Sequence, residues 1–285
     1  MSDKELFADS FIDLGKIKGI PHPELFEEVS KVIAEDTLEY VNAHCKKVIP
    51  KDSFYIRYVK RCIDIVLSAI ALIVTLPINL IIAICTYFDV GRPIIFQQER
   101  VGRSGVIFII NKFRNMTNDT SEDGTLLPPY QRVTRFGKFV RKTSLDELLN
   151  FWSIFKGDMS LIGPRPLPPE YNDFYSERHK MRYAVRPGLE CPMLHPIEDK
   201  MTWGLQFEND IYYVENVSFL LDIKMIFALF RLVFNEKSSE IRGNAVRGSF
   251  MGYQQDGTSI DSQKIERKYY EKALERMGYV KPVSI

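Results

Sequence analysis

The sequence predicts an α+β fold that is predominantly helical and attached to a membrane. Residues Ile65 to Phe88 form a run of about 24 residues without a charged side chain. Two short runs typical of β-strands follow it, Pro93–Phe96 and Val106–Ile110. Apolar residues with helical spacing recur before and after these runs. Together these patterns indicate a helical protein with one small sheet and one membrane segment.

Composition excludes several classes of protein. The 38 Lys and Arg residues nearly balance 37 Asp and Glu residues, so a net charge of +1 gives no reason to expect nucleic-acid binding. The four cysteines form no C-x-x-C pair and no set with zinc spacing. We therefore expect a reducing compartment, no structural metal and no disulfide framework.

The N-terminal region, residues 1–58, is predicted to be a small soluble helical extension. A helical pattern covers Glu24 to His44, and it aligns apolar side chains on one face (Leu25, Val29, Val32, Ile33 and Val41). The sequence does not reveal the function of this region.

The apolar run from Ile65 to Phe88 is long enough to cross the hydrocarbon of a bilayer, because a helix rises about 1.5 Å per residue. Pro77 lies near its middle, where proline removes a helical hydrogen bond and bends the axis. Basic residues flank both ends, so the positive-inside rule favours neither orientation. From hydropathy alone, a kinked transmembrane anchor and a bent, re-entrant helix both remain open.

A β-hairpin is predicted from residue 93 to residue 110, with its turn at Gly102 and Gly105. Lys112 and Arg114 follow the second strand and precede a polar loop. Lone basic residues are usually solvated, but this position leaves a phosphate-binding role open.

The stretch from Arg141 to Pro166 carries the strongest chemical signal. Ser144 has the sequence context of a helix N-cap, and Glu147, three residues later, that of its capping-box partner. Asp146 and Glu147 would then lie in the first turn of a helix that ends at Gly157. A helix N-terminus stabilises carboxylates and phosphates, so this is a favourable place for an anionic ligand.

After this helix, Pro164 and Pro166 enclose Arg165 and restrict its backbone, and a fixed arginine can bind a phosphate with two hydrogen bonds. Later segments carry weaker signals. His179 is expected at the surface, and the apolar helix Phe219 to Phe234 either lies at a membrane interface or packs in a core. An amphipathic helix is predicted from Asp261 to Met277.

These residues resemble the bacterial sugar transferase family, the monotopic phosphoglycosyl transferases that begin glycan assembly on a polyprenyl phosphate. The resemblance covers about Lys60 to Phe234. Its motifs are KR-x-x-D from Lys60, the proline in the apolar helix, GRPIIFQQERVG from Gly91, KFRNM from Lys112 and the whole stretch from Arg141 to Pro166. Their order and spacing carry the resemblance more than any single motif does.

The resemblance implies a monotopic membrane protein with a re-entrant N-terminal helix broken at Pro77. The expected domains are the extension 1–58, the membrane helix 59–90, a cytoplasmic catalytic domain 91–237 with the hairpin, and a polar C-terminal extension 238–285 with a helix. The expected location is the bacterial inner membrane, with the catalytic domain facing the cytoplasm.

The resemblance also implies an enzyme that moves a sugar-1-phosphate from a UDP-sugar to undecaprenyl phosphate and releases UMP. Asp146 would be the nucleophile that forms an aspartyl phosphosugar, and Asp146 and Glu147 would form the catalytic dyad. Mg²⁺ would neutralise the diphosphate, with Glu147 and Asp158 as its ligands. The substrate phosphates would be bound by basic residues (Arg165, Lys112, Arg141 and Arg186).

The chain departs from the family pattern in two places. After RPGL it carries ECPMLHPIEDKMTWGL, where many relatives have a short T-G-x-x-Q-V-like segment. The region before Lys60 lacks the four extra membrane helices of larger relatives. A homodimer and contacts with downstream glycosyltransferases are compatible with this interpretation.

Two other functions use the same residues. A membrane-tethered, metal-dependent phosphohydrolase would use the same carboxylates and arginines with water as the acceptor. A non-catalytic membrane scaffold would use Asp146 and Glu147 only to cap a helix. A lipid-linked product distinguishes the transferase from both.

Overall fold

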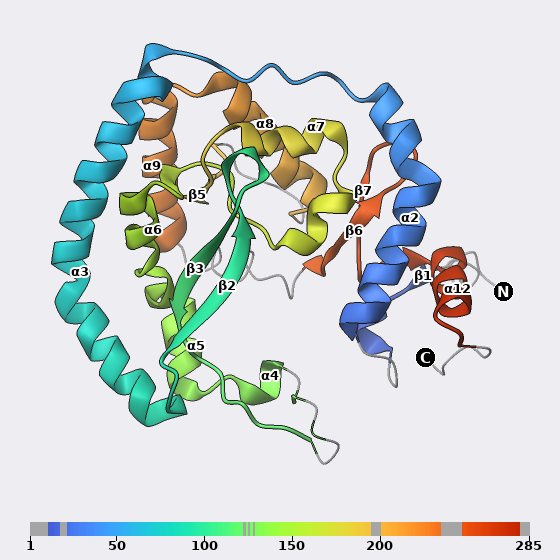
Figure 1. The fold of residues 1–285 in the computed structure, drawn as a ribbon, viewed down its shortest axis with the longest axis horizontal. Helices are drawn as coiled ribbons and strands as arrows, with labels where there is room; N and C mark the ends of the chain where they lie inside the picture. The colour runs from blue at the N-terminus through green and yellow to red at the C-terminus, as the bar shows by residue number, and fades with distance from the viewer. Residues whose placement is uncertain are drawn as a thin grey trace.

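The computed structural model describes residues 11–17, 22–121, 124, 126–127, 129–194, 201–234 and 247–279, and most of them are helical (Figure 1). The main helices are α2 (His22–His44), α3 (Lys60–Val90), α4 (Pro129–Arg132), α5 (Arg135–Lys142), α6 (Asn150–Lys156), α7 (Glu177–Lys180), α8 (Trp203–Asn216), α9 (Phe219–Phe234) and α12 (Arg267–Arg276). The strands are β1 (Phe11–Ile12), β2 (Ile95–Val101), β3 (Ile107–Phe113), β4 (Ser160–Ile162), β5 (Gly188–Glu190), β6 (Phe250–Tyr253), β7 (Ser259–Asp261) and β8 (Ile265–Glu266). They pair into small two-stranded sheets.

Helix α3 has the polarity expected of a helix that faces lipid. Its inward positions include Asp64, Ser68 and Thr86, which are buried against the protein. Its outward positions are large and apolar, and Phe88 is 81% exposed. Within the described residues, Tyr55–Val90 is the one helix long and apolar enough to cross a membrane, and only 11% of its most apolar window is buried. A core helix of a soluble protein would be mostly buried, so membrane association fits α3 better.

Helix α3 continues through Pro77 as one element and follows a curved path along the side of the molecule (Figure 1). Proline cannot donate the backbone hydrogen bond of its turn, which favours bending. Thr75 Oγ1 donates to the carbonyl of Ala71 at 2.7 Å, a contact that also bends helices. The re-entrant path itself stays a prediction.

Both ends of α3 are attached to the same protein body. At its start, Lys60 Nζ pairs with Asp222 at 2.7 Å and Arg61 Nη1 donates to the Ile154 carbonyl at 2.7 Å. At its end, Thr134 Oγ1 donates to Asp89 Oδ2 at 2.5 Å, and Arg114 donates to the Val90 carbonyl. The helix is therefore fixed to the protein body at both ends.

An antiparallel pair lies where the sequence predicts a hairpin. Strands β2 and β3 pair from Ile95 opposite Phe113 to Val101 opposite Ile107, and their turn contains Gly102 and Gly105. The end of β3 brings Lys112 toward the segment that carries Asp146 and Glu147.

Two glycines allow β4 and β5 to cross closely beside the turn Pro164–Pro166, which we call the proline turn. Strands β4 and β5 are parallel, with Ile162 opposite Glu190. A Cβ atom added to Gly188 would lie 2.2 Å from the Gly163 nitrogen, and one added to Gly163 would lie 2.5 Å from the Arg186 carbonyl oxygen. Only glycine permits this approach, which brings Glu190 next to the turn that holds Arg165.

The two terminal regions share one hydrophobic core. The apolar face predicted for α2 is confirmed, because Leu25, Val29, Val32 and Ile33 are fully buried. Their core partners come from the other end of the chain and include Met251, Ile260, Tyr270 and Leu274. The C-terminal helix is shorter than predicted, since β7 and β8 occupy the residues before Arg267. We call these packed regions, residues 11–17, 22–41 and 250–279, the terminal module.

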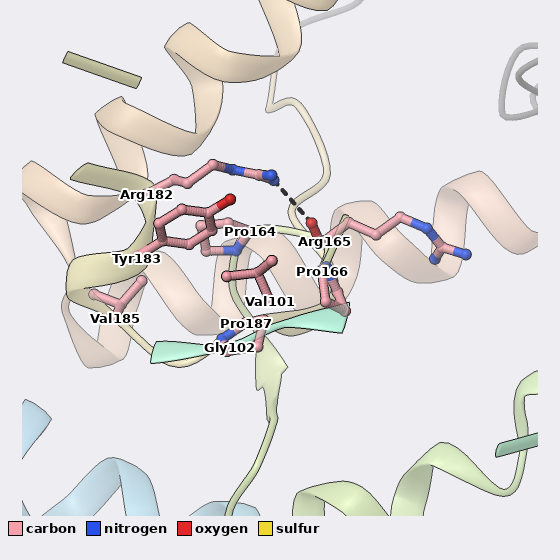
Figure 2. A pocket seen from close by; sticks show the side chains of 9 residues that line it. All are labelled: Val101, Gly102, Pro164, Arg165, Pro166, Arg182, Tyr183, Val185 and Pro187. Atoms are coloured by element: carbon pink, nitrogen blue, oxygen red, sulfur yellow. Dashed lines mark hydrogen bonds between the residues drawn. The ribbon is translucent and has the colours of Figure 1, made fainter. Parts of the chain in front are cut away.

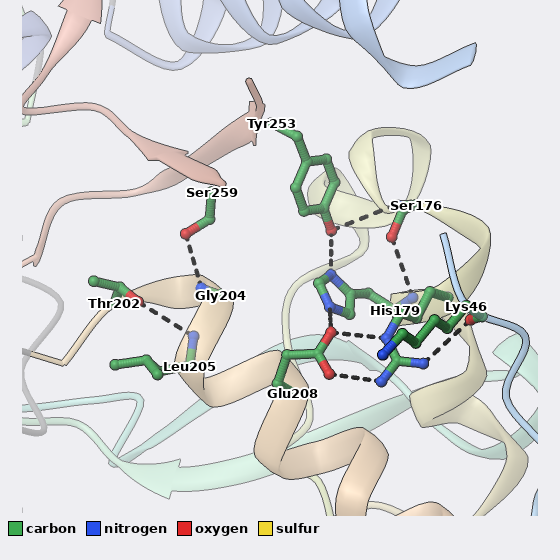
Figure 3. A network of polar contacts seen from close by, with 10 residues as sticks. Lys46, Ser176, His179, Thr202, Gly204, Leu205, Glu208, Tyr253 and Ser259 are labelled. Carbon is green, nitrogen blue, oxygen red and sulfur yellow. Dashed lines mark hydrogen bonds and ion pairs between the residues drawn. The ribbon is translucent and has the colours of Figure 1, made fainter. Parts of the chain in front are cut away.

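The prediction that His179 lies at the surface was wrong. His179 is buried, with Nδ1 at 2.7 Å from Tyr253 Oη and Nε2 at 2.8 Å from Glu208 Oε1. Figure 3 shows the ring between these two partners, which come from the terminal module and from α8. Arg178 adds two hydrogen bonds to Glu208 and one to the Lys46 carbonyl. This network joins the terminal module to the centre of the protein.

Candidate active site

Asp146 and Glu147 lie in the short 3-10 turn η4 (Leu145–Glu147), which precedes α6. The predicted capping box was wrong. Ser144 has a left-handed backbone with φ of 56°, and its side chain makes no capping hydrogen bond. The helix predicted from Ser144 is therefore divided into η4 and α6. The Glu147 carboxylate does not cap a helix.

Glu147 is held between two cations. Its Oε1 lies 2.7 Å from Lys112 Nζ and 2.5 Å from Arg165 Nη2, and its Oε2 accepts from Arg165 Nη1 at 3.3 Å. Burial acts to raise the pKa of Glu147, but the charges of Arg165 and Lys112 hold that pKa well below its ordinary value. Glu147 is thus ionised throughout the physiological range.

Asp146 has a different environment, although it is the adjacent residue. It is 6% exposed, and Asn115 Nδ2 approaches its Oδ2 at 3.4 Å. Burial raises the pKa of Asp146, the charge of Glu147 raises it further, and Lys112 and Arg141 oppose both effects. The surroundings therefore raise the pKa of Asp146 and lower the pKa of Glu147. Opposite shifts of this kind are common in catalytic pairs.

Arg165 is fixed through its backbone and its guanidinium. Arg182 Nη2 donates to the Arg165 carbonyl at 2.8 Å, and Arg165 Nη1 donates to the Leu189 carbonyl at 3.0 Å. Figure 2 shows the Arg165 backbone in the wall of a small pocket, while its guanidinium points away from that pocket. Arg182 is itself held by a buried ion pair with Asp210 at 2.7 Å. The proline turn thus presents Arg165 to Glu147 with little freedom.

The other predicted site residues occupy different positions. Arg141 is exposed at the end of α5 and within electrostatic reach of Asp146, whose pKa it lowers. Asp158 pairs with Lys156 at 2.7 Å, and Arg186 Nε donates to the Gly157 carbonyl at 3.1 Å. In the described part of the chain neither Asp158 nor Arg186 has a contact with the dyad, and their roles stay predictions.

Several neighbours of the dyad were missed in the sequence. Asn115 contacts Asp146, Glu190 Oε2 lies 3.6 Å from Arg165 Nη1, and Arg182 supports the Arg165 backbone. Asn115 directly follows Lys112 and Arg114 at the end of β3, and this position was the available signal that Asn115 lies near the site. Glu190 and Arg182 carry no such local signal. The crossing of β4 and β5 brings Glu190 to the site, and the ion pair with Asp210 holds Arg182 there.

The carboxylates of Asp146 and Glu147 are ligands of the type that Mg²⁺ prefers. No group of three or more His, Cys, Asp or Glu side chains suited to a metal occurs among the described residues. Mg²⁺ often needs only one or two carboxylates together with substrate phosphates and water. Asp146 and Glu147 supply adjacent carboxylates, although both Glu147 oxygens already face cations. A metal here would depend on oxygen ligands from the substrate.

A model of the bacterial sugar transferase family matches residues 55–236, which is more than half of the chain. The chain belongs to the bacterial sugar transferase family. The matched segment begins just before α3 and contains the dyad, the hairpin and the proline turn, so the site described above lies entirely in the family domain. The terminal module lies outside it.

Curated relatives of this bacterial sugar transferase share about a third of their aligned residues with it. The uncharacterized sugar transferase EpsL of Bacillus subtilis is 34% identical over 68% of this chain and 96% of its own length. The UDP-N-acetylgalactosamine-undecaprenyl-phosphate N-acetylgalactosaminephosphotransferase of Aeromonas hydrophila is 34% identical over 62% of this chain and 44% of its own. The UDP-glucose:undecaprenyl-phosphate glucose-1-phosphate transferase of Klebsiella pneumoniae is 34% identical over 63% of this chain and 41% of its own length. The chain thus spans less than half of the two relatives with named substrates.

Proposed function

We propose that this protein is an undecaprenyl-phosphate sugar-1-phosphate transferase. It transfers a sugar-1-phosphate from a UDP-sugar to undecaprenyl phosphate and releases UMP, as the first membrane step in the assembly of a surface glycan. The observation that carries the proposal is the pair of adjacent carboxylates, one held ionised by Lys112 and Arg165 and the other buried with few partners. The names of the relatives support the same class of reaction.

In the first step Asp146 attacks the β-phosphorus of the UDP-sugar. A bond forms between an Asp146 carboxylate oxygen and phosphorus, and the bond from phosphorus to the oxygen bridging the two phosphates breaks. The electron pair of that bond leaves with UMP. An ionised carboxylate is the reactive form, so the raised pKa of Asp146 also indicates a more basic nucleophile.

In the second step an oxygen of undecaprenyl phosphate attacks the same phosphorus. The bond from phosphorus to Asp146 breaks, the carboxylate is restored, and the product is undecaprenyl diphosphate carrying the sugar. The sugar–phosphate bond is never broken, which distinguishes this reaction from glycosyl transfer.

Lys112 and Arg165 supply fixed positive charge near the phosphoryl oxygens. Both cations pair with Glu147, and Arg165 also lies 3.6 Å from Glu190, so they are held beside the dyad where the phosphoryl oxygens would bind. Mg²⁺, with Glu147 and the substrate oxygens as ligands, would further neutralise the diphosphate and leave Asp146 free to attack. Glu147 keeps Lys112 and Arg165 in place before the substrate arrives.

The lipid acceptor explains the need for α3. A polyprenyl chain stays in the bilayer, so its phosphate must meet the dyad at the membrane surface. We infer that α3 is re-entrant, which the attachment of both its ends to one body supports. The protein would then be monotopic in the inner membrane, with the catalytic domain 91–237 on the cytoplasmic side, where nucleotide sugars are made.

The experiment is a UMP-release assay on detergent-solubilised protein with Mg²⁺, a panel of UDP-sugars and undecaprenyl phosphate. The proposal predicts UMP release and a lipid-linked sugar diphosphate that forms only with the lipid acceptor. Free sugar phosphate formed equally without the acceptor would instead identify a phosphohydrolase. Absence of UMP across the panel would contradict the proposal.

A further inference from the structure

An apolar groove lies where α3 ends and β2 begins (Figure 1). It has a volume of about 820 Å³, and it is formed by the last turns of α3 and the segment that follows them (Ala83, Ile84, Tyr87, Phe88, Arg92, Pro93, Ile94 and Ile95). The groove opens on the lipid-facing side of α3, where Ile84 is 59% exposed. A groove with this lining suits a ligand that has an apolar chain.

Arg92 is the one charged residue that lines the groove. It is exposed, and its guanidinium carbon lies 5.7 Å from the centre of the Tyr87 ring. None of the ion pairs in the described part of the chain involves Arg92. Asp89, which is close in sequence, accepts a hydrogen bond from Thr134 at 2.5 Å instead. An apolar lining with an unpaired arginine fits an anionic lipid, because a guanidinium binds phosphate oxygens well.

Arg114 connects the groove to the candidate site. Its Nη1 donates to the Arg92 carbonyl at 3.1 Å, and its backbone N–H donates to the Ile94 carbonyl at 2.9 Å. The next residue, Asn115, has its Nδ2 at 3.4 Å from Asp146 Oδ2. The backbone of the groove and the proposed nucleophile are therefore joined through two consecutive residues.

The hairpin makes a second connection. Ile95 lines the groove at the start of β2, and the next residue, Phe96, lies opposite Lys112 on β3. Lys112 Nζ is 2.7 Å from Glu147 Oε1. The groove therefore adjoins both carboxylates of the dyad at the end of β3, on the side where α3 ends.

This position favours a polyprenyl phosphate over an ordinary membrane phospholipid as the occupant. The phosphate of a polyprenyl phosphate is a monoester at the end of its chain, so it can reach a neighbouring site while the chain stays in the groove. A monoester also carries more negative charge than the diester of a phospholipid, and an unpaired arginine binds it more strongly.

We propose that this groove binds the first isoprenyl units of the lipid acceptor and that Arg92 binds the acceptor phosphate beside the dyad. Helix α3 would then form one wall of the acceptor site in addition to attaching the protein to the membrane. This inference rests on the proposed function, because it names where the acceptor of that reaction binds.

Arg92→Gln in the detergent-solubilised full chain tests the charge. We expect the KM for undecaprenyl phosphate to rise about tenfold, because a charge-assisted contact to the phosphate is lost. The KM for the UDP-sugar and the yield of the Asp146 adduct without acceptor should keep their wild-type values. Arg92→Lys should recover part of the acceptor affinity. A wild-type acceptor KM in Arg92→Gln would overturn the inference, and so would an equal loss of adduct formation.

Ile84→Trp and Ile81→Trp test the groove with a matched pair. The two isoleucines lie on the same helix and are 59% and 62% exposed, but only Ile84 lines the groove. Ile84→Trp should raise the acceptor KM roughly threefold or more, because the larger side chain takes space that the isoprenyl chain needs. Ile81→Trp should leave it unchanged. Equal acceptor KM values in the two variants would overturn the inference.

A polyprenyl phosphate with a photoreactive group on its first isoprenyl unit gives a readout that does not depend on turnover. Irradiation should label residues 83–95 in the wild-type protein, label them less in Arg92→Gln, and do so even with excess phosphatidylglycerol. Labelling confined to other segments, or lost when phosphatidylglycerol is in excess, would overturn the inference. If the wild-type protein releases no UMP with any UDP-sugar, the proposed function fails and the labelling alone decides on the groove.

Discussion

Asp146 and Glu147 are neighbours in sequence but experience opposite electrostatic environments. Lys112 and Arg165 neutralise Glu147 directly, whereas Asp146 is buried and receives one long hydrogen bond from Asn115. Because Glu147 stays charged, it repels the charge of Asp146 and makes that carboxylate more basic. In the proposed mechanism the dyad therefore separates two tasks, with Glu147 organising the cations and Asp146 acting as the nucleophile.

Asp146→Asn tests this division of tasks. We expect transfer activity to fall roughly 10³-fold or more, because an amide cannot act as the nucleophile. The pKa of Asp146 is raised in the folded state, so its charge opposes folding at neutral pH and its removal should keep or raise the melting temperature. UMP release and thermal unfolding measure the two effects. An active variant would contradict the nucleophile assignment.

The pH dependence of the reaction should report the same group. Asp146 must be ionised to attack, so kcat/KM for the UDP-sugar should fall as pH falls through its raised pKa, above the pH at which an ordinary aspartate protonates. Arg141 lowers this pKa, so Arg141→Gln should move the acidic limb to higher pH. Lys138→Gln, on the exposed side of the same helix, is the control and should leave the limb unmoved.

At the residue scale the sequence predicted part of the site. Lys112 and Arg165 meet Glu147, because a strand end and a proline turn are local signals that place side chains predictably. The capping box was wrong because Ser144 adopts a left-handed backbone, which the S-x-x-E pattern does not reveal. Glu190 was missed because its position depends on a crossing of distant segments.

At the scale of elements, the crossing of β4 and β5 sets the geometry of the proline turn. Gly163 donates its N–H to the Glu190 carbonyl at 3.3 Å, and Gly188 donates to the Pro164 carbonyl at 3.0 Å. These contacts hold the backbone on both sides of Arg165. Two strands of three residues each thereby position Arg165, the arginine that pairs with Glu147.

Gly188→Ala should disturb this crossing. Its added Cβ would lie 2.2 Å from the Gly163 nitrogen, so the two strands must separate. We expect a loss of about 1–3 kcal/mol in the free energy of unfolding and a larger KM for the UDP-sugar, as Arg165 is displaced. Thermal unfolding and steady-state kinetics measure both.

Gly204→Ala is a suitable control for this change, since the nearest atom to its added Cβ is the Ser259 hydroxyl oxygen at 3.2 Å. A wild-type melting temperature and KM in Gly188→Ala would show that the close crossing is not required.

Element prediction succeeded where the signal was periodic and long. Helix α9 covers the predicted residues Phe219–Phe234, and α2 starts two residues before the predicted Glu24 and ends at the predicted His44. It failed where elements are short. The helix predicted from Asp261 begins only at Arg267, because the end of β7 and strand β8 lie in its predicted first turns.

At the scale of the whole molecule, the two ends of the chain form one module at one side of the family domain. Helix α2 lies between β6 and α12 (Figure 1), and its apolar face is covered by residues more than two hundred positions later. The sequence showed two separate amphipathic regions. It gave no sign that they cover each other, because contacts of this separation leave no periodic pattern.

Leu25→Ala measures how much this shared core contributes. Leu25 is fully buried, so we expect a loss of about 2–5 kcal/mol in the free energy of unfolding. Glu39→Ala, at an exposed position of the same helix, should change it by less than about 0.5 kcal/mol. Equal stability of the two variants would show that the terminal module does not contribute to the fold.

The most direct measurement of the central claim is mass spectrometry of the Asp146 peptide after the protein is incubated with a UDP-sugar and Mg²⁺ and quenched without lipid acceptor. The account predicts that this peptide gains the mass of one sugar phosphate, that undecaprenyl phosphate removes the adduct, and that Asp146→Asn never acquires it. An unmodified Asp146 peptide in protein that releases UMP and forms the lipid-linked product, or an adduct on another residue, would contradict it.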